Sequence, residues 1–293
     1  MSVTLSRRQL LKRMAAAVLL TGLSAPSAAP DRGSPPRAPF KLGLTPVILD
    51  ERIQLLRGWR EDLETRLQRP VEMLRRTSYE EIVNLLRAGG LDAAWLCGYP
   101  YVVHADELRL VASPLYRGKP LYRSYIIAGA PTNGLESLEG GVFAFADPDS
   151  NSGWLYPTYR LMEGGHDPDT FFSRTFFTWS HRKVIHAVAV GLADGGAVDG
   201  YVYETLERHE PDLVRRLHIV ERSPAFGFPP LVAAAGLDKQ TFKAFREALT
   251  GMEDDEEGRR ILDGLNLDGF GEADGSDYDD IRRMTARVEA ARR

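Results

Sequence analysis

Short apolar runs alternate with segments of helical periodicity along the first part of the chain. The apolar runs at 40–46, 70–75 and 91–98 predict strands, and apolar residues at helical spacing predict helices at 49–67 and 78–90. Such an alternation is typical of a mostly parallel, doubly wound sheet. Because ligands bind at the carboxyl ends of the strands in these sheets, the pattern predicts a ligand site at that edge.

The alternation starts again after residue 118 and predicts a second α/β unit. Its expected strands and helices are, in chain order, a strand at 122–129, a strand at 141–146, a helix at 152–165, a strand at 174–180, a helix at 181–195 and a strand that begins at 196. A further strand at 229–236 returns to the first unit, and a helical tail is expected over 238–270. The chain therefore crosses between the two units twice.

These elements predict an α/β fold with two lobes and a cleft between them. One lobe is expected from residues 38–117 together with 224–293, and the other from residues 118–223. Two crossover strands, near 115–123 and 221–231, would join the lobes and act as a hinge. Exported proteins of this size and layout are often solute receptors.

The first 29 residues have the pattern of an export signal. A basic segment, "SRRQLLKR", precedes the short apolar stretch "MAAAVLLTGLSA" and the small residues "APSAA". The adjacent Arg7 and Arg8 resemble a twin-arginine signal, and the alternative is an ordinary Sec signal that happens to contain two arginines. Both predict cleavage and a periplasmic protein. No later apolar run reaches the roughly 20 residues that a membrane-spanning helix needs.

Composition narrows the function. Hydrophobic residues make up 43% of the 293 residues, which is enough for a sizeable core. The 37 basic and 41 acidic residues are interleaved, so the basic stripe of a nucleic-acid-binding protein is absent from the sequence. Cys97 is the single cysteine, which excludes an intramolecular disulfide and a CxxC zinc site. We expect no cofactor.

The stretch "DPDSNSGW" places small polar residues between an expected strand and an expected helix. The helix would begin near Ser150 to Ser152, where the first N–H groups have no partner within the helix and can bind an anion. Serine hydroxyls add donors, and Gly153 lets the backbone approach a ligand closely. The alternative is that a serine here only caps the helix.

Residues 145–159, "FADPDSNSGWLYPTY", resemble the signature of the phosphonate and phosphite receptors of ABC importers. That signature is Asp-Pro-x-Ser-Thr-Ser-Gly before a helix. Segments 78–96, 120–127, 180–199 and 256–284 are similar to further parts of the family in the same order. The resemblance implies a periplasmic-binding-protein fold that captures a small oxyanion for an ABC permease.

The resemblance also implies which residues bind the ligand. They are Ser150, Asn151, Ser152, Tyr79, Tyr122, His181, Asp199 and Thr45. The first three would hold the oxyanion, the two tyrosines would close the pocket, and His181 would donate to an anion oxygen. Asp199 would lie at a strand end facing the cleft, where an acceptor suits an anion that carries a proton or hydroxyl.

Two departures from the family bear on the substituent of the anion. Asn151 replaces the family threonine and can still donate through its amide. In receptors for aminoalkylphosphonates a carboxylate of the return segment neutralises the ligand amine, and here Pro229 stands at that position. The sequence therefore favours a smaller or uncharged substituent.

Cys97 is the third departure, since the family usually has glycine at this strand-to-helix turn. A thiolate is a soft ligand for metalloids, and some members of this receptor family sense arsenite for a two-component system. The alternative hypothesis is therefore a receptor that senses arsenite through Cys97 and signals to a sensor histidine kinase. A buried, inert cysteine is the simpler interpretation.

An enzyme would need a catalytic pattern, and none is visible. Cys97 could be paired with His104 or His181 as nucleophile and base, but the surrounding sequence matches no thiol-enzyme signature. HExxH, paired-carboxylate and P-loop patterns are also absent from the sequence. We therefore predict a monomeric binding protein rather than an enzyme.

Overall fold

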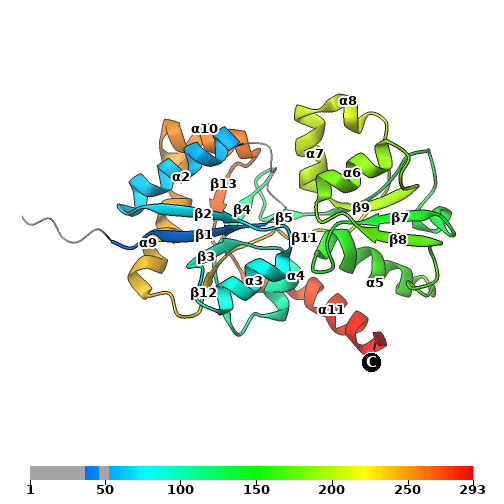
Figure 1. The fold of residues 1–293 in the computed structure, drawn as a ribbon, viewed down its shortest axis with the longest axis horizontal. Coiled ribbons are helices and arrows are strands. Elements are labelled where there is room, and N and C mark those ends of the chain that lie inside the picture. Colours follow the sequence, from blue (N-terminus) through cyan, green and yellow to red (C-terminus); the bar gives the residue numbers. More distant parts are fainter. Residues whose placement is uncertain (1–36, 46–52, 293) are drawn as a thin grey trace, which may run out of the picture. The chain divides into compact units, whose positions relative to one another are not determined.

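The computed structural model describes residues 37–45 and 53–292. The predicted export signal at 1–29 lies outside the described residues. Two separate sheets organise the described chain, one with six strands and one with five (Figure 1). We call the part that carries the six-stranded sheet lobe 1 and the part that carries the five-stranded sheet lobe 2. We use the predicted boundaries, with lobe 2 at 118–223, and these boundaries stay a prediction.

Lobe 1 has the strand order β13-β4-β12-β3-β1-β2. Its strands are β1 (Phe40–Leu44), β2 (Val71–Arg75), β3 (Ala93–Trp95), β4 (Leu108–Leu115), β12 (Leu231–Ala234) and β13 (Gly269–Gly271). The first three run parallel, whereas β12 pairs antiparallel with both β3 and β4. The returning chain therefore enters the middle of the sheet against the direction of its neighbours.

The helices of lobe 1 are α2 (Ile53–Leu67), α3 (Tyr79–Arg87), α4 (Gly98–Val103), α9 (Lys239–Thr250), α10 (Glu256–Leu265) and α11 (Asp279–Arg292), with the short turns η3 (Met252–Asp254) and η4 (Gly275–Tyr278). Helices α2, α3 and α9 of lobe 1 pack against this sheet, whereas α10 packs on α2 and α11 packs on α4. Trp59 of α2 meets Trp95 of β3 edge to face, with ring centroids 5.8 Å apart, and both rings are fully buried. These aromatic rings anchor the core of lobe 1.

Lobe 2 has the strand order β10-β6-β9-β7-β8. Its strands are β6 (Ser124–Ala128), β7 (Val142–Phe145), β8 (Arg174–Phe177), β9 (Gly195–Asp199) and β10 (His218–Arg222). Its helices are η1 (Leu135–Leu138), η2 (Asn151–Leu155), α5 (Tyr156–Glu163), α6 (His181–Ala189), α7 (Gly200–His209) and α8 (Pro211–Val214). Helices α5 and α6 cover opposite faces of the sheet (Figure 1). The expected second α/β unit is therefore present.

Two short strands connect the lobes. Strand β5 (Leu121–Tyr122) pairs antiparallel with β11 (Phe226–Gly227) in a sheet of its own. Both fall within the crossover segments expected from the sequence. A two-residue pairing holds the two crossovers together while leaving little sheet to resist bending.

Some local expectations were wrong. The tail is not helical through to Phe270, because α10 ends at Leu265 and Asn266 takes a left-handed conformation with φ of 58°. The chain then adds β13 to the edge of lobe 1 by pairing with β4. Strands β12, β13 and β6 run against their neighbours, so the sheets are mixed rather than mostly parallel. Among the described residues, no helix combines the length and the apolar character that crossing a membrane would require.

Candidate anion-binding site

The predicted site residues lie at the starts of five helices. Tyr79 is the first residue of α3 and His181 is the first of α6, while Cys97, Ser150 and Asp199 are the N-caps of α4, η2 and α7. Each helix start presents unpaired N–H groups and the positive end of a helix dipole. Contacts between these residues, described below, bring the five starts together.

Residues Ser150 to Gly153, which we call the cradle, form the first turn of η2. Ser150 Oγ accepts a hydrogen bond from Gly153 N at 2.9 Å. The carbonyl of Ser150 accepts from both Trp154 N and Leu155 N, so the turn is wider than in an α-helix. Ser152 N has no hydrogen-bond partner among the described residues. The cradle therefore keeps a backbone donor and hydroxyl groups for a ligand.

Gly153 is required by the space around it. A Cβ at this position would lie 2.4 Å from Ala146 Cβ and 3.1 Å from His181 Cε1. The missing side chain lets the cradle lie directly against the end of β7 and the start of α6. This close approach is what brings Ser150 near His181.

His181 is held in one tautomer. Its Nδ1 accepts a hydrogen bond from Asp199 N at 3.1 Å, and its Nε2 lies 3.5 Å from Ser150 Oγ. Burial lowers the pKa of His181 to about 3, so the ring is neutral at physiological pH. A neutral ring whose Nδ1 accepts must carry its proton on Nε2. His181 is thus a hydrogen-bond donor directed at the cradle.

Two buried carboxyl groups flank the cradle. Asp199 Oδ1 accepts from Tyr201 N at 2.8 Å and Val202 N at 3.3 Å, as an N-cap does. Burial raises the pKa of Asp199 to about 7. Burial likewise raises the pKa of Asp147 to about 6. Protonated forms of both carboxyls are therefore accessible near neutral pH.

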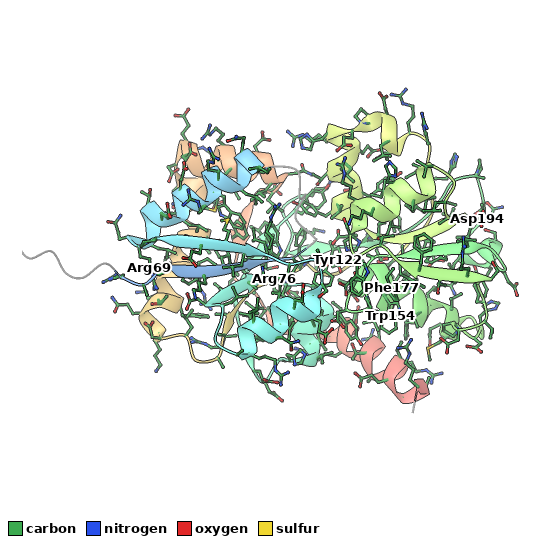
Figure 2. The ribbon with its side chains drawn as sticks, in the orientation of Figure 1. Arg69, Arg76, Tyr122, Trp154, Phe177 and Asp194 are labelled. Atoms are coloured by element: carbon green, nitrogen blue, oxygen red, sulfur yellow. The ribbon has the colours of Figure 1, made fainter. Side chains whose placement is uncertain are left out.

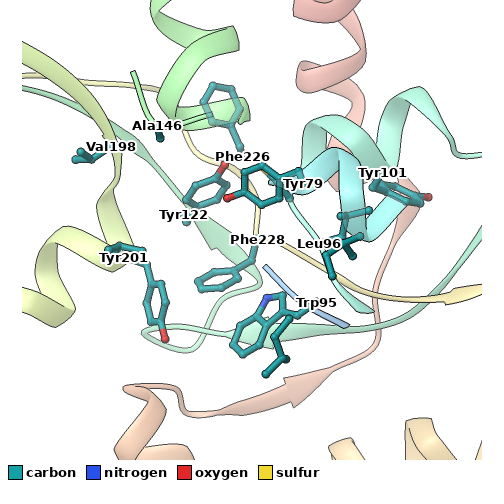
Figure 3. Packing of buried hydrophobic residues seen from close by; sticks show 14 of the residues in the cluster. Tyr79, Trp95, Leu96, Tyr101, Tyr122, Ala146, Val198, Tyr201, Phe226 and Phe228 are labelled. Atoms are coloured by element: carbon teal, nitrogen blue, oxygen red, sulfur yellow. The ribbon is translucent and has the colours of Figure 1, made fainter. Parts of the chain in front are cut away.

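Tyr79 is the contribution of lobe 1 near the cradle, and Tyr122 is the contribution of the crossover. Figure 3 shows their hydroxyl groups pointing toward one another. Tyr122 Oη accepts a hydrogen bond from Asn151 Nδ2 at 2.9 Å, which leaves its own proton to donate. Burial raises the pKa of both phenols well above the usual value, so both remain protonated donors. Asp147 Oδ2 accepts from Tyr79 N at 3.3 Å and ties α3 of lobe 1 to the loop before the cradle.

Three buried polar atoms at this place have no hydrogen-bond partner among the described residues. They are Tyr79 Oη, Ser152 Oγ and Asn151 Oδ1. A buried polar group without a partner costs free energy, and such groups are rare in folded proteins. Two of the three can donate and one can only accept. The set is satisfied by a small ligand that accepts several hydrogen bonds and carries a proton of its own.

The site has no buried cation. Neither lysine nor arginine occurs among the buried residues of the described chain. The electrostatic attraction for an anion therefore comes from the helix starts and from neutral hydroxyl, imidazole and amide donors. A multiply charged anion has no counter-charge here, whereas a singly charged oxyanion fits the donor set.

Cys97 belongs to the same cluster but is not a reactive thiol. Its Sγ accepts a hydrogen bond from Asn151 N at 3.3 Å, and its side chain is buried. Burial raises the pKa of this thiol to about 12, so the thiolate form is negligible at neutral pH. Among the described residues, no group of three or more His, Cys, Asp or Glu side chains could hold a metal ion.

Thr45 directly follows β1, and its part in ligand binding stays a prediction. Its Oγ1 donates to the carbonyl of Trp95 at 2.9 Å, so its proton is used within lobe 1. Among the other predicted residues, Ser150, His181 and Asp199 are joined by the contacts above, and so are Asn151 and Tyr122. Two contributors were missed: Asp147, and Ser124, whose Oγ donates to the carbonyl of Ser152 at 2.7 Å. Asp147 could have been predicted from the sequence as a carboxylate at a strand end, whereas no pattern around Ser124 indicates a site residue.

Comparison with known families identifies the kind of protein. The family described as ABC transporter, phosphonate, periplasmic substrate-binding protein matches residues 42–278. The chain belongs to this family. The phosphonate-receptor family is one of transport receptors rather than enzymes, and its members are periplasmic.

Individual relatives share part or most of the chain. The phosphate-import protein PhnD of Mycolicibacterium smegmatis is 32% identical over 160 residues, which are 49% of this chain and 50% of the relative, so the chain spans about half of its length. A probable phosphite-binding protein, PhnD1 of Prochlorococcus marinus, is 23% identical over 263 residues, 84% of this chain and 86% of the relative.

Solved structures confirm the two-lobed periplasmic-binding-protein fold. A binding component of an ABC phosphonate transporter from Pseudomonas aeruginosa has a TM-score of 0.78 at 23% identity, covering 84% of this chain and 85% of its own. PhnD1 of Prochlorococcus marinus, solved with methylphosphonate, has a TM-score of 0.75 at 22% identity, covering 85% and 98%. The arsenite-sensing alternative is not favoured, because the family is one of importer receptors and Cys97 is a protonated thiol.

Proposed function

We propose that this receptor binds a small, singly charged phosphorus oxyanion, such as phosphite or methylphosphonate, and delivers it to an ABC permease. The observation that carries the proposal is the set of unpartnered buried atoms, Tyr79 Oη, Ser152 Oγ and Asn151 Oδ1, at the meeting point of five helix starts. No group of the described residues satisfies these atoms, and a tetrahedral oxyanion offers acceptors in several directions at once.

The proposed ligand would be held by neutral donors of the cradle. Ser150 Oγ already faces Gly153 N and His181 Nε2, so its own proton is available to a ligand. Ser152 would contribute its amide and its hydroxyl. Hydrogen bonds from neutral donors to a charged oxygen are stronger than those between neutral groups. These three donors would supply the affinity that a buried cation provides elsewhere.

The wall near Tyr122 is apolar, which limits the substituent on phosphorus. The ring of Tyr122 lies 6.4 Å from that of Phe226 and 5.8 Å from that of Phe228 (Figure 3). Pro229 is buried and its carbonyl accepts from Trp95 Nε1 at 2.9 Å. No carboxylate in this return segment could neutralise a ligand amine. A hydrogen or a methyl group on phosphorus suits this wall, and an ammonium group does not.

Ligand binding would hold the two lobes together. Lobe 2 contributes Ser150, Ser152 and His181, whereas lobe 1 contributes Tyr79. A ligand that contacts both sides stabilises the arrangement in which they meet, and the β5–β11 pair would serve as the hinge. The permease would then recognise the closed, loaded receptor. Residues 1–29 would direct export, with Arg7 and Arg8 as the twin-arginine pair.

The decisive experiment measures binding by calorimetry with phosphite, methylphosphonate, 2-aminoethylphosphonate, phosphate and sulfate. We expect phosphite or methylphosphonate to bind most tightly and 2-aminoethylphosphonate and sulfate to bind weakly. The double variant Ser152→Ala, His181→Ala should lose at least about a hundredfold in affinity, because each side chain donates to a charged ligand.

A matched control uses the same two residue types on the exposed surface of lobe 2. Ser137→Ala with His218→Ala should leave affinity unchanged, since both side chains are exposed and lie outside the site contacts. If the control and the site variant lose affinity equally, or if none of the five anions binds the wild-type protein, the proposal is wrong. Export is tested separately by locating an Arg7→Lys, Arg8→Lys variant in cell fractions.

A further inference from the structure

Trp154, the residue that follows the cradle, contacts two side chains of lobe 1. Its ring stacks on Tyr99 of α4, with centroids 6.0 Å apart and planes at 24°. The guanidinium carbon of Arg292, the last residue of α11, lies 4.5 Å from the same ring centroid. Figure 2 shows Trp154 beside the C-terminal helix. Only 7% of its surface is exposed.

The two side chains that hold Trp154 are fixed to one another through their helices. Helix α4 packs so closely on the C-terminal segment that a Cβ at Gly98 would lie 2.7 Å from Ile281 Cδ1. The rings of Tyr101 and Tyr278 meet edge to face, 4.9 Å between centroids. Helices α4 and α11 therefore form one unit within lobe 1. Tyr99 and Arg292 both belong to this unit.

Helix α11 also reaches across to lobe 2. It packs against α4 of lobe 1 and against η2 and α5 of lobe 2. Since α11 has 14 residues, it is about 21 Å long, which is enough to contact both lobes. The domain division expected from the sequence puts this helix wholly in lobe 1, but its C-terminal end contacts lobe 2.

The held ring lies one residue from the ligand donors. Trp154 N donates to the carbonyl of Ser150 at 3.1 Å, within the wide first turn of η2. The same turn is fixed at its other end, where Asn151 N donates to Cys97 Sγ at the start of α4. Helix α4 thus contacts the cradle turn at two points, and α11 contacts it at a third. The orientation of the Ser152 donors depends on how this turn is held.

We propose that Tyr99 and Arg292 are positioning residues that act through Trp154: they hold the cradle turn in its binding orientation and stabilise the closed receptor. The inference rests on the proposed function, because it assigns these residues a role in retaining the anion. Neither residue touches the ligand. Both contacts join the lobes, so they exist only when the lobes meet. When these two contacts are lost, a smaller fraction of the receptor is in the closed state, and the apparent affinity for the anion falls by the same factor.

The test is the double variant Tyr99→Ala, Arg292→Ala, with binding of methylphosphonate and phosphite measured by stopped-flow and calorimetry. Stacked aromatic pairs and exposed cation–π contacts are each modest, so we expect apparent affinity to fall about tenfold, mostly through faster dissociation. The melting temperature of the ligand-free protein should change little. Tyr99→Phe and Arg292→Lys keep the ring and the charge and should restore most of the affinity.

Spectroscopy and amide exchange provide readouts that a purely structural role would not change. In a Trp179→Phe background, which retains Trp59, Trp95 and Trp154, ligand addition should alter the tryptophan fluorescence, and both a Trp154→Phe variant and the double variant should lack this change. Amide exchange over 151–156 should rise in the double variant while the cores of both sheets remain protected. Arg260→Ala is the matched control, because its recorded ion pair is with Glu257 on the same helix of lobe 1.

The outcomes separate this inference from the proposed function. If the wild type binds an anion and Ser152→Ala abolishes binding, but the Tyr99→Ala, Arg292→Ala variant keeps wild-type dissociation and exchange, the positioning role is refuted. If the wild type binds none of the anions, the proposed function fails. In that case, raised amide exchange confined to residues 151–156 in the double variant would still support the positioning role of Tyr99 and Arg292. Unchanged exchange would overturn it.

Discussion

Lobes 1 and 2 contribute to the site in different ways. In lobe 2 the donors are joined to one another, since Ser150 contacts His181 and the ring of His181 accepts from Asp199 N. Lobe 1 contributes separate groups, Tyr79 and Cys97, whose contacts in the site are with lobe 2 rather than with each other. In the proposed site, lobe 2 would therefore hold a preformed half-site, and lobe 1 would complete that half-site when the lobes meet.

This division of labour predicts the order of mutational effects. Changes in the preformed half should remove binding, because the remaining donors are no longer aligned. Changes in lobe 1 should weaken binding and speed release, because the anion can still lie on the cradle. The predictions below test this difference, beginning with the largest expected effect.

The largest effect is expected for Gly153→Ala in lobe 2. The new Cβ would lie 2.4 Å from Ala146 Cβ, so the cradle must move away from the end of β7. Overpacking of this kind costs about 1–3 kcal/mol of folding free energy, and the displaced amides no longer face the anion. Calorimetry should detect no binding. Gly118→Ala, at an open turn with φ of 72°, controls for the general effect of replacing a glycine, and retained binding in Gly153→Ala would contradict the cradle.

A smaller effect is expected for Tyr79→Phe in lobe 1. The change removes one buried donor that has no protein partner and keeps the ring. Loss of a hydrogen bond to a charged ligand corresponds to about 10-fold to 100-fold in affinity. Dissociation measured by stopped-flow should account for most of the loss. If association slows instead, lobe 1 takes part in the first encounter and the comparison between the lobes is wrong.

The pH dependence of binding tests Asp199 within lobe 2. Because burial raises its pKa from 3.8 to about 7, its carboxylate forms as the pH rises through neutrality and repels an anion. Wild-type affinity should therefore fall between pH 6 and pH 8. Asp199→Asn keeps the helix cap and should show a smaller decrease, which comes from Asp147 and from the titration of the ligand itself. Identical pH profiles for the two proteins would exclude Asp199 from the site.

Asp199 and His181 should change the folding stability of the ligand-free protein with pH in opposite directions. The raised pKa of Asp199, about 7 against 3.8 unfolded, makes the folded state bind its proton more tightly, so this contribution falls as the pH rises from about 4 to about 7. The lowered pKa of His181, about 3 against 6.5, gives a contribution that is lost as the pH falls below 6.5. Urea unfolding of Asp199→Asn and His181→Gln at several pH values should separate the two trends.

The smallest effect is expected for Cys97→Ser. The serine hydroxyl can accept from Asn151 N as the thiol does, so affinity for the anion should stay within about threefold of the wild type. Arsenite should stabilise neither protein in a thermal shift assay, because the thiol is buried and protonated. Stabilisation of the wild type alone would restore the sensing hypothesis.

Much of this site could be predicted from the sequence because its signals are local. Small polar residues between a strand and a helix indicate a helix start, and Ser150 is indeed the N-cap of η2. The family resemblance added Tyr79, His181 and Asp199, which also lie at helix starts. Thr45 was included on the same basis, and the structure shows its hydroxyl used within lobe 1.

Other features depend on contacts between residues far apart in the sequence. Helix α4, "GYPYVV", has six residues and an internal proline, so it shows no helical periodicity. Strand β13 contains two glycines and exists because β4 offers an edge to pair with. The contacts of Trp154 with Tyr99 and Arg292 join three separate segments. No pattern in any one of these segments indicates its partners.

The absence of buried lysine and arginine from the described chain has a consequence for the conditions in which the receptor works. Attraction between exposed charges is screened by salt within about 10 Å at moderate ionic strength, whereas buried dipoles are screened far less. An anion held by helix starts, hydroxyls and the imidazole of His181 should therefore keep its affinity from dilute buffer to high salt. Because the described residues place no buried cation at the proposed site, we expect the ligand to be selected by its shape and by its pattern of hydrogen-bond donors and acceptors.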